Sequence, residues 1–323
     1  MPVIITVTFN PTIDKSISVA GLVPDKKLPC TITDYEAGGG GINVARAIAK
    51  LGGNVIAVYL SGGDTGNKIR KLLRMDSVKN IAVKIKESNR ENLIVEDISA
   101  KQQYLFDMPG PSVTRREWQK CLARIETIDD VEYIVASGSL PPGVPPQIFK
   151  ELSALAGKKN AKLIVDTSGE GLKQALEAGV YLIKPNIREL ASLASKERLD
   201  AGSVAVTARQ LIDQGNCGAI VVSMGAAGAL LVTKEQTVQI SAPSLPVEST
   251  VGAGDSMLAG IVLNLSAGKS LLNSVQYGVA CGTAATIKPG TKLCSKEDAD
   301  RIYQIIRATS KFPNQVKTLP MNV

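Results

Sequence analysis

Hydrophobic and polar residues follow one another along this chain in a pattern that predicts strands alternating with helices. Six short runs rich in β-branched residues end in polar loops, and helical patterns follow them. The runs are VIITVTF (3–9), NVIAVYL (54–60), YIVASG (133–138), KLIVDTS (162–168), YLIK (181–184) and AIVVSMG (219–225). This alternation predicts an α/β fold, with a mostly parallel central sheet and helices on both faces. Ligands of such sheets bind beyond the carboxyl ends of the strands, so functional residues are expected in the loops there.

Two stretches, 14–38 and 88–110, break this pattern because apolar and polar residues alternate in them around turn-forming tips. They predict strands of a small antiparallel sheet that projects from the main domain as a lid. A thin sheet with one apolar face needs a cover, which a second copy of the chain can supply. At 323 residues the chain is long enough for one large α/β domain or for two ordinary ones.

Composition agrees with a globular protein, since 44% of the 323 residues are apolar. No apolar run is long enough to cross a bilayer, and the first residues lack the features of a signal peptide, so we expect a cytoplasmic protein without a membrane partner. The net charge of +7 is dispersed, and four Phe and one Trp leave little for base stacking. Small anions are therefore expected as partners, rather than nucleic acid.

Histidine is absent from the chain, which narrows the chemistry that it can perform. Without histidine there is no Ser–His or Cys–His nucleophile pair and no histidine-ligated metal. The five cysteines are scattered, which fits neither a disulfide framework nor a zinc site. Proton transfer must therefore fall to a carboxylate, a lysine, a tyrosine or water.

The segment STVGAGDS (249–256) is a candidate for such chemistry. Gly252 and Gly254 permit a nest of backbone N–H groups, and the dipole of a helix predicted at 256–267 adds positive charge at the same place. Asp255 fits two roles, because it could cap that helix or act as a base beside an anion hole. A carboxylate beside an anion hole is the combination that phosphoryl transfer requires.

Three other loops carry candidate binding residues. The glycines at 38–41 precede a helical pattern and let backbone amides approach a ligand, although a tight turn would use them as well. In KPNIREL (184–190), Asn and Glu side chains offer oxygens that suit Mg²⁺, but a strand-to-helix turn uses the same residue types. The segment SMGAAGALLV (223–232) predicts a strand, a glycine turn and a returning strand, which suits nucleotide contact or a simple hairpin.

The predicted lid carries three charged residues of interest, Asp14, Lys27 and Arg90. Asp14 could bind sugar hydroxyls, and Lys27 and Arg90 could clamp a phosphate. The alternative is that they are solvated surface charges.

The order of these motifs resembles the ribokinase-like (PfkB) carbohydrate kinase family over essentially the whole chain. AGGGGINVARAIAKLGG (37–53) is similar to the family's early signature and STVGAGDSMLAG (249–260) to its late one. Four intervening blocks fall in the family's order: SGSLPPGVP (137–145), IVDTSGEGL (164–172), KPNIREL and YGVACGTAAT (277–286). The resemblance implies a single ribokinase-like domain over residues 1–323 and an ATP-dependent kinase that uses Mg²⁺. The lid of the family commonly clasps a second subunit, so the resemblance also implies a homodimer through the lid. Many relatives also bind a monovalent cation such as K⁺ beside the anion hole.

Within the family, the phosphosugar branch contains minor-type 6-phosphofructokinases, 1-phosphofructokinases and tagatose-6-phosphate kinases. The last two groups usually have GGKGxN at the early signature, whereas this chain has Gly40 at the lysine position. GGGGINVAR and GTKLCS (290–295) resemble the first group. The resemblance thus implies transfer of the γ-phosphate of ATP to the C1 hydroxyl of fructose 6-phosphate. The other two activities, and a non-catalytic sugar-responsive regulator, are the alternatives.

The resemblance also implies roles for single residues. Asp255 matches the general base. The remaining matches are the anion hole (Gly252, Ala253, Gly254), the sugar-contacting positions (Asp14, Gly39, Gly40, Asn43, Ser139), the clamp on the 6-phosphate (Lys27, Arg90), the nucleotide-phosphate and magnesium region (Lys184, Asn186, Glu189) and the ATP loop (Ser223, Gly225, Gly228).

Overall fold

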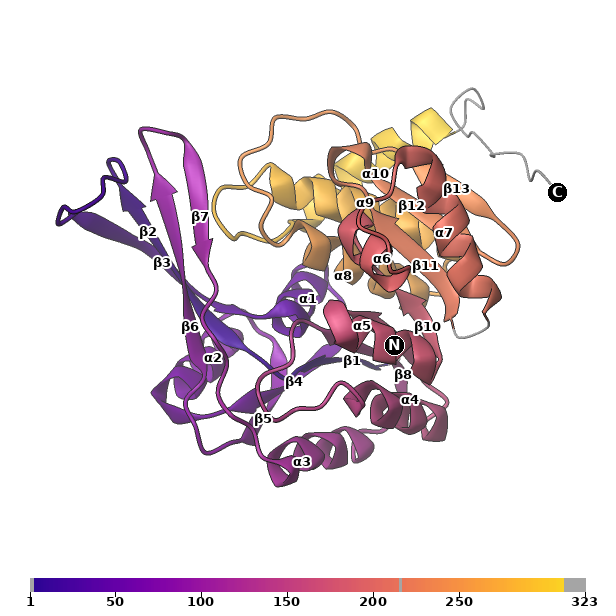
Figure 1. Cartoon of the computed structure of the whole chain (residues 1–323), viewed down its shortest axis with the longest axis horizontal. Coiled ribbons are helices and arrows are strands. Elements are labelled where there is room, and N and C mark those ends of the chain that lie inside the picture. The colour runs from indigo at the N-terminus through magenta and orange to yellow at the C-terminus, as the bar shows by residue number, and fades with distance from the viewer. Residues whose placement is uncertain (1–2, 215–216, 311–323) are drawn as a thin grey trace.

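The central feature of the structure, a computed structural model that describes residues 3–214 and 217–310, is a nine-stranded sheet (Figure 1). Its strands, in spatial order, are β13 (Thr237–Ile240), β12 (Ala229–Thr233), β11 (Cys217–Ser223), β10 (Val180–Ile183), β9 (Lys162–Asp166), β8 (Val131–Ser137), β1 (Val3–Thr8), β4 (Val55–Ser61) and β5 (Lys79–Lys84). Neighbours from β11 to β5 are parallel, whereas β12 and β13 add antiparallel strands at one edge. The predicted α/β fold with a mostly parallel sheet is confirmed.

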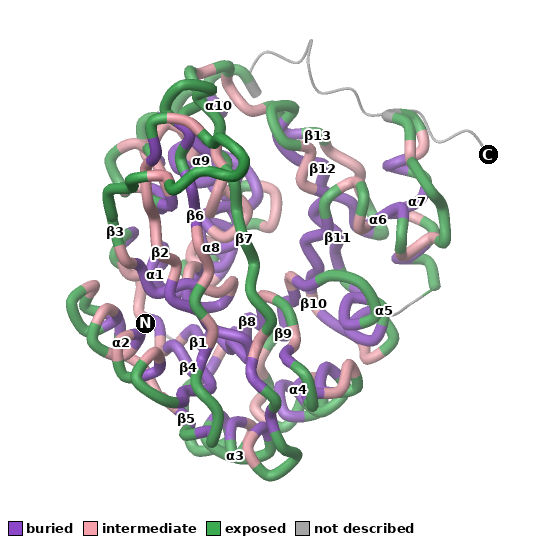
Figure 2. Tube along the Cα trace, turned by 60° about the vertical axis from the view of Figure 1, so that its left-hand side comes forward, coloured by how far each residue is buried: buried purple, intermediate pink, exposed green. Residues whose placement is uncertain are grey.

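Helices cover both faces of this sheet. One face packs against α1 (Gly40–Lys50), α2 (Gly63–Met75), α8 (Ala253–Ser266), α9 (Leu271–Thr286) and α10 (Lys296–Ser310). The other packs against α3 (Arg115–Glu126), α4 (Ile148–Lys158), α5 (Gly169–Ala178), α6 (Ile187–Leu193) and α7 (Ala201–Asp213). Successive strand residues point to opposite faces, so Ile4 lies in the first core and Ile5 in the second. This two-sided burial explains why the central strands read as continuous apolar runs (Figure 2).

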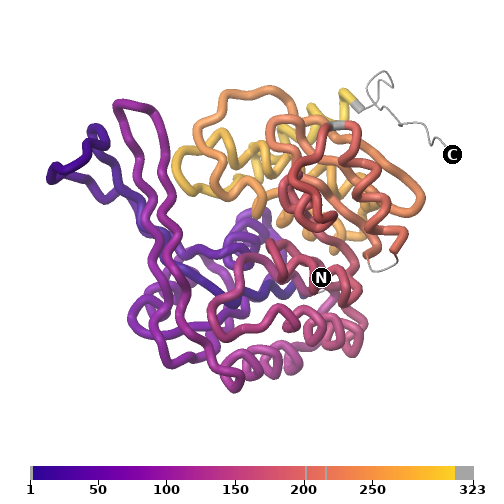
Figure 3. The backbone as a smooth tube through the Cα atoms, viewed as in Figure 1, coloured from indigo at the N-terminus to yellow at the C-terminus, as the bar shows by residue number. Residues whose placement is uncertain are grey.

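The predicted lid is a separate four-stranded sheet in the order β3 (Cys30–Gly38), β2 (Thr12–Val19), β6 (Arg90–Asp97) and β7 (Gln102–Phe106). Its two hairpins stand out from the rest of the backbone in Figure 3. Each hairpin is antiparallel, as expected, but the two are joined by the parallel pair β2–β6. The parallel pairing follows from connectivity, because β2 and β6 continue outward from the carboxyl ends of two parallel strands, β1 and β5.

Two local features differ from the sequence predictions. The edge strand β5 was not expected, because its sequence KNIAVK lacks a long apolar run. In the structure it lies at the edge of the sheet and is partly exposed. Helix α8 begins three residues earlier than predicted, since Gly252 takes a left-handed conformation (φ 74°) that starts the helix at Ala253. Within the described residues, the helices are all too short or too polar to span a membrane.

Candidate active site

A cavity of about 210 Å³ opens at the carboxyl ends of β8 and β9, between the first turns of α1 and α8. This is the edge of a parallel sheet where ligands are expected. It brings together four residues singled out from the sequence. The lining residues are Gly40, Ser137, Gly138, Ser139, Asp166, Thr167, Ser168, Glu189 and Asp255.

Asp255 lies in the first turn of α8, and its Oδ2 accepts a hydrogen bond of 3.0 Å from Nδ2 of Asn43 on α1. Burial raises the pKa of Asp255 to about 7, and the charge of Asp166 acts in the same direction. The Asn43 bond and Lys184 partly oppose that rise. The capping role considered for Asp255 is wrong, because Gly252 occupies the N-cap position. A carboxylate with a near-neutral pKa is suited to accept a proton.

The turn before Asp255 is the candidate anion hole. A helix directs its first N–H groups out of its end, where they have no partner within the helix. Nζ of Lys184 lies close to Gly254, because a Cβ at Gly254 would stand 3.4 Å from it, an ordinary contact distance. The ammonium group of Lys184 therefore lies beside the turn that precedes Asp255.

Lys184 is held by an ion pair with Asp166, with 3.1 Å between Nζ and Oδ2. Burial by itself lowers the pKa of Lys184, but Asp166 outweighs that effect and raises the pKa above its ordinary value. The side chain therefore keeps its positive charge. Asp166 was missed from the sequence, although its place directly after the strand KLIV was the signal that could have found it.

Asn186 and Glu189 form a reciprocal capping box at the start of α6. Oδ1 of Asn186 accepts from the Glu189 N–H at 2.9 Å, and Oε2 of Glu189 accepts from the Asn186 N–H at 2.8 Å. The strand-to-helix turn considered from the sequence is therefore present. Glu189 also lines the cavity, where burial raises its pKa and the Asn186 bond partly opposes this.

The donor atoms around the cavity suit a Mg²⁺ ion that is bound mainly through the phosphates of a substrate. No group of three or more acidic, cysteine or histidine side chains is poised for a metal ion in the described part of the chain. Mg²⁺ in proteins commonly binds through one or two carboxylates, substrate phosphates and water. Glu189, with Asn186 beside it, fits that arrangement.

A second cavity, of about 380 Å³, adjoins the first turn of α8. It contains Ser223, Gly225 and Gly228 from the turn between β11 and β12, which includes a short 3₁₀ helix at Gly225–Ala227. Apolar side chains of α8, α9 and the segment before α8 complete its wall, namely Pro243, Leu245, Val247, Met257 and Val279. Its mixed polar and apolar lining fits a nucleotide. Because Ala253 and Gly254 also line it, this cavity meets the anion hole.

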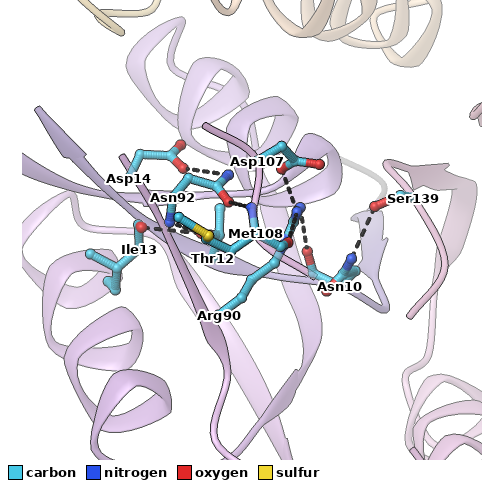
Figure 4. Close-up of polar contacts among 9 residues, drawn as sticks. All are labelled: Asn10, Thr12, Ile13, Asp14, Arg90, Asn92, Asp107, Met108 and Ser139. Atoms are coloured by element: carbon cyan, nitrogen blue, oxygen red, sulfur yellow. Dashed lines mark hydrogen bonds and ion pairs between the residues drawn. The ribbon is translucent and has the colours of Figure 1, made fainter. Parts of the chain in front are cut away.

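The base of the lid supplies a polar cluster at the ends of β2 and β6 (Figure 4). Nδ2 of Asn92 donates to Oδ1 of Asp14 at 3.1 Å. Burial raises the pKa of Asp14 to about 6, against the lowering effects of Asn92 and Arg90. Asp14 is thus held rigidly beside the site, but the sequence did not point to its partner Asn92.

Arg90 lies in the same cluster with its side chain 8% exposed. It donates to the carboxylate of Asp107, to the Met108 carbonyl at 2.9 Å and to the Asn10 carbonyl at 3.4 Å. Asn10, which follows β1, also donates through Nδ2 to Oγ of Ser139 at 3.0 Å. Nε of Arg90 and Oδ1 of Asn10 are buried without a partner among the described residues. The cluster therefore keeps hydrogen-bonding capacity for a ligand.

Lys27 is not brought to this cluster. It is exposed in the connection between β2 and β3, which follows Val19 at the outer end of the lid. Arg90 pairs with Thr12 at the inner end, seven residues from Val19 along β2. At about 3.3 Å per residue, the two ends are separated by about 23 Å. The expected clamp of Lys27 with Arg90 is therefore absent within the single chain.

The early glycine run packs tightly against the loop after β8. A Cβ at Gly40 would stand 2.3 Å from Oγ of Ser137 and 2.7 Å from the backbone nitrogen of Gly138. Gly39 before it has φ 99°, a conformation that favours glycine. The run is thus a tight turn that also walls the cavity, and a side chain at position 40 would require this wall to move.

Comparisons with known proteins agree with this geometry. Residues 7–298 match the model of the pfkB family carbohydrate kinases. The chain is 40% identical to ATP-dependent 6-phosphofructokinase isozyme 2 of Escherichia coli (strain K12), over 93% of this chain and 97% of the relative. It is 31% identical to 1-phosphofructokinase of Borreliella burgdorferi, over 94% and 97%. A crystal structure of phosphofructokinase-2 from Escherichia coli in complex with potassium superposes with a TM-score of 0.92 at 40% identity, covering 95% of this chain and 100% of the other.

Proposed function

Because the chain belongs to the pfkB family of carbohydrate kinases, we propose that it transfers the γ-phosphate of ATP to the C1 hydroxyl of fructose 6-phosphate. The observation that carries this proposal is the position of Asp255. Asp255 lies in the first turn of α8 and lines the cavity of about 210 Å³, which we propose holds the sugar. Its neighbour Gly254 lines the cavity of about 380 Å³, which we propose holds the nucleotide. A base in that place faces both substrates of a phosphoryl transfer.

The reaction follows from groups already placed. Asp255 accepts the proton of the acceptor hydroxyl as its oxygen attacks the γ-phosphate. The amides of Ala253 and Gly254 and the ammonium of Lys184 stabilise the charge that develops on the transferring group. Ser223, Gly225 and Gly228 hold the nucleotide.

The metal ions belong to the same proposal. Mg²⁺ held through Glu189 and Asn186 would neutralise charge on the ATP phosphates. A related crystal structure is described in complex with potassium, which supports a monovalent cation such as K⁺, and we propose that it binds beside the anion hole.

The acceptor is proposed to be a sugar phosphate because the sugar side carries Arg90. Its guanidinium lies almost buried beside Asn10 and keeps one unpaired donor, which suits a phosphate oxygen. Asp14, Asn43 and Ser139, with the backbone at Gly39 and Gly40, would contact the sugar hydroxyls. A lysine at position 40, as in the other two kinase groups, would require the wall formed by Ser137 and Gly138 to move, which favours fructose 6-phosphate.

A homodimer through the lid is part of the proposal. The lid exposes apolar side chains, among them Ile32 at 49%, Ile98 at 59% and Leu105 at 56%. The strand register turns Ile32 and Leu105 to opposite faces of the lid. A second copy of the chain that covered the Leu105 face would remove its apolar surface from water. Lys27, at the outer end of the lid, would then act on phosphate only across that interface or after lid closure.

A coupled assay of ADP release tests the proposal against a panel of sugars and phosphosugars. Fructose 6-phosphate is expected to give the highest kcat/KM, with fructose 1-phosphate and tagatose 6-phosphate well below it. A preference for fructose 1-phosphate would assign the chain to 1-phosphofructokinases instead. Binding of phosphosugars without ADP release would favour a non-catalytic regulator.

A further inference from the structure

A buried polar chain connects the lid to the anion hole, and it begins at Arg46 on α1. Arg46 is 5% exposed, yet it lies outside both cavities. Its Nη2 donates to Oε1 of Glu36 at 2.8 Å, its Nη1 to the Ala37 carbonyl at 2.9 Å and its Nε to Oδ2 of Asp76 at 2.5 Å. A guanidinium with three directed bonds fixes the geometry of every partner.

Glu36 carries the connection from α1 to the lid. It lies on β3, directly opposite Asp14 on β2 in the strand register. The charge of Glu36 is one of the influences that raise the pKa of Asp14, after burial. A shift of Glu36 would therefore be felt at the residue proposed to bind the sugar.

The second carboxylate oxygen of Glu36 accepts a hydrogen bond from Oγ1 of Thr291, 255 residues further along the chain. Both side chains are buried. Thr291 belongs to the segment 288–295 between α9 and α10. The Thr291 hydroxyl therefore links the lid directly to this segment.

The segment 288–295 packs directly on the anion-hole turn. A Cβ at Gly252 would stand 2.9 Å from Cδ2 of Leu293 and 3.8 Å from the Thr291 carbonyl. The backbone N–H of Cys294 donates to Oγ of Ser256, one residue after Asp255, at 3.3 Å. The position of this segment therefore limits where the first turn of α8 can lie.

We propose that Arg46, Glu36 and Thr291 are positioning residues that couple the lid to the anion hole. When the sugar phosphate binds beside Asp14, it fixes the position of β3. The hydrogen bonds of Arg46, Glu36 and Thr291 then fix the segment 288–295, and with it Gly252 and the amides that stabilise the transferring phosphate. The link makes nucleotide binding and turnover depend on the sugar. This inference rests on the proposed kinase function.

Two substitutions at one position test the link. Thr291→Val keeps the shape of the side chain but removes the hydroxyl, whereas Thr291→Ser keeps the hydroxyl. We expect Thr291→Val to lower kcat about tenfold, the equivalent of about 1.4 kcal/mol in the barrier. Fructose 6-phosphate should also change the Kd of a non-hydrolysable ATP analogue in the wild type and much less in Thr291→Val. Thr291→Ser should match the wild type within twofold in both measurements.

Further readouts separate coupling from simple stabilisation. If Thr291→Val lowered only Tm, with kcat and the sugar effect on nucleotide Kd equal to those of Thr291→Ser, the proposal would be overturned. Arg46→Lys keeps the charge but cannot make the three bonds, so it should lose the same coupling, and normal coupling in this folded variant would also count against the link.

Failure of the kinase function would appear separately, as a wild type that releases no ADP with any acceptor. Amide hydrogen exchange then tests the coupling between the lid and the anion hole without any turnover. Protection of residues 250–256 by fructose 6-phosphate should be lost in Thr291→Val and kept in Thr291→Ser. Equal protection in both variants would overturn the link.

Discussion

Asn43 and Asp255 are joined by a hydrogen bond of 3.0 Å although 212 residues separate them in the chain. Asn43 belongs to the early glycine-rich motif and Asp255 to the late one, so this bond joins the two motifs at the cavity. The amide donates to the carboxylate and favours its charged form, while burial acts in the opposite direction. The balance leaves a carboxylate that can both lose and accept a proton near neutral pH.

Asp255→Asn is expected to lower kcat by about 10²- to 10⁴-fold, the range that general-base catalysis contributes. The change preserves shape and removes the proton acceptor, so the Kd values for sugar phosphate and nucleotide should stay nearly the same. Initial-rate kinetics together with equilibrium titration check both parts. Asp213→Asn, at an exposed position on α7, is the matched control and should be fully active. Substantial turnover by Asp255→Asn would remove Asp255 from the role of base.

The pH profile of kcat/KM should show an acidic limb with a midpoint near pH 7, because Asp255 must be deprotonated to act and its pKa is raised to about 7. Replacing Asn43 by Ser removes the donor that lowers this pKa. The acidic limb of Asn43→Ser is therefore expected to move to higher pH. A limb that stays in place would show that Asn43 does not set the charge of Asp255.

The same pKa has a consequence for stability with a definite sign. The folded-state pKa of Asp255 lies above its unfolded value, so the folded protein binds the proton more tightly, and stability is lost as pH rises from 3.8 to about 7, with no further loss above that. Asp255→Asn removes this loss. The variant should have a higher Tm than the wild type at pH 8, and the difference should shrink below pH 4. A lower Tm for the variant at pH 8 would contradict the pKa shift.

The sequence located the ends of the parallel strands well, because central strands buried on both faces are continuous apolar runs. Lys184, which follows β10 directly, was found for this reason, whereas Ser139, two residues after β8, was named only through the family resemblance. Asp166, the last residue of β9, was not singled out although it ends an apolar run in the same way, and its ion pair with Lys184 reveals its place in the site.

Other features depended on geometry that sequence spacing does not encode. A capping role for Asp255 required α8 to begin at residue 256. The left-handed conformation of Gly252 starts the helix at Ala253 instead, so Asp255 lies inside its first turn and is not the cap. The pairing of Lys27 with Arg90 failed because Lys27 lies in the connection at the outer end of the lid, whereas Arg90 begins β6 at the inner end. Strand register, rather than charge, determines which lid residues meet.

Arg90→Ala is expected to raise the KM for fructose 6-phosphate about 10- to 100-fold with a smaller effect on kcat, since charge-assisted hydrogen bonds contribute about 1.5–3 kcal/mol. The KM for ATP should not change. Lys84→Ala, which removes an exposed cation at the end of β5, serves as the control. An unchanged KM for the sugar phosphate would exclude Arg90 from the phosphate site.

Leu105→Glu is expected to shift the protein from dimer to monomer. Leu105 lies on β7 with an exposed fraction of 56%, and a charge placed there would be buried without a partner if a second lid covered it. Val206→Glu is a matched control, because Val206 is equally exposed, at 57%, but lies on α7 in the main domain. Sedimentation velocity of the two variants distinguishes the surfaces. A dimer that survives Leu105→Glu but dissociates in Val206→Glu would move the interface from the lid to the main domain.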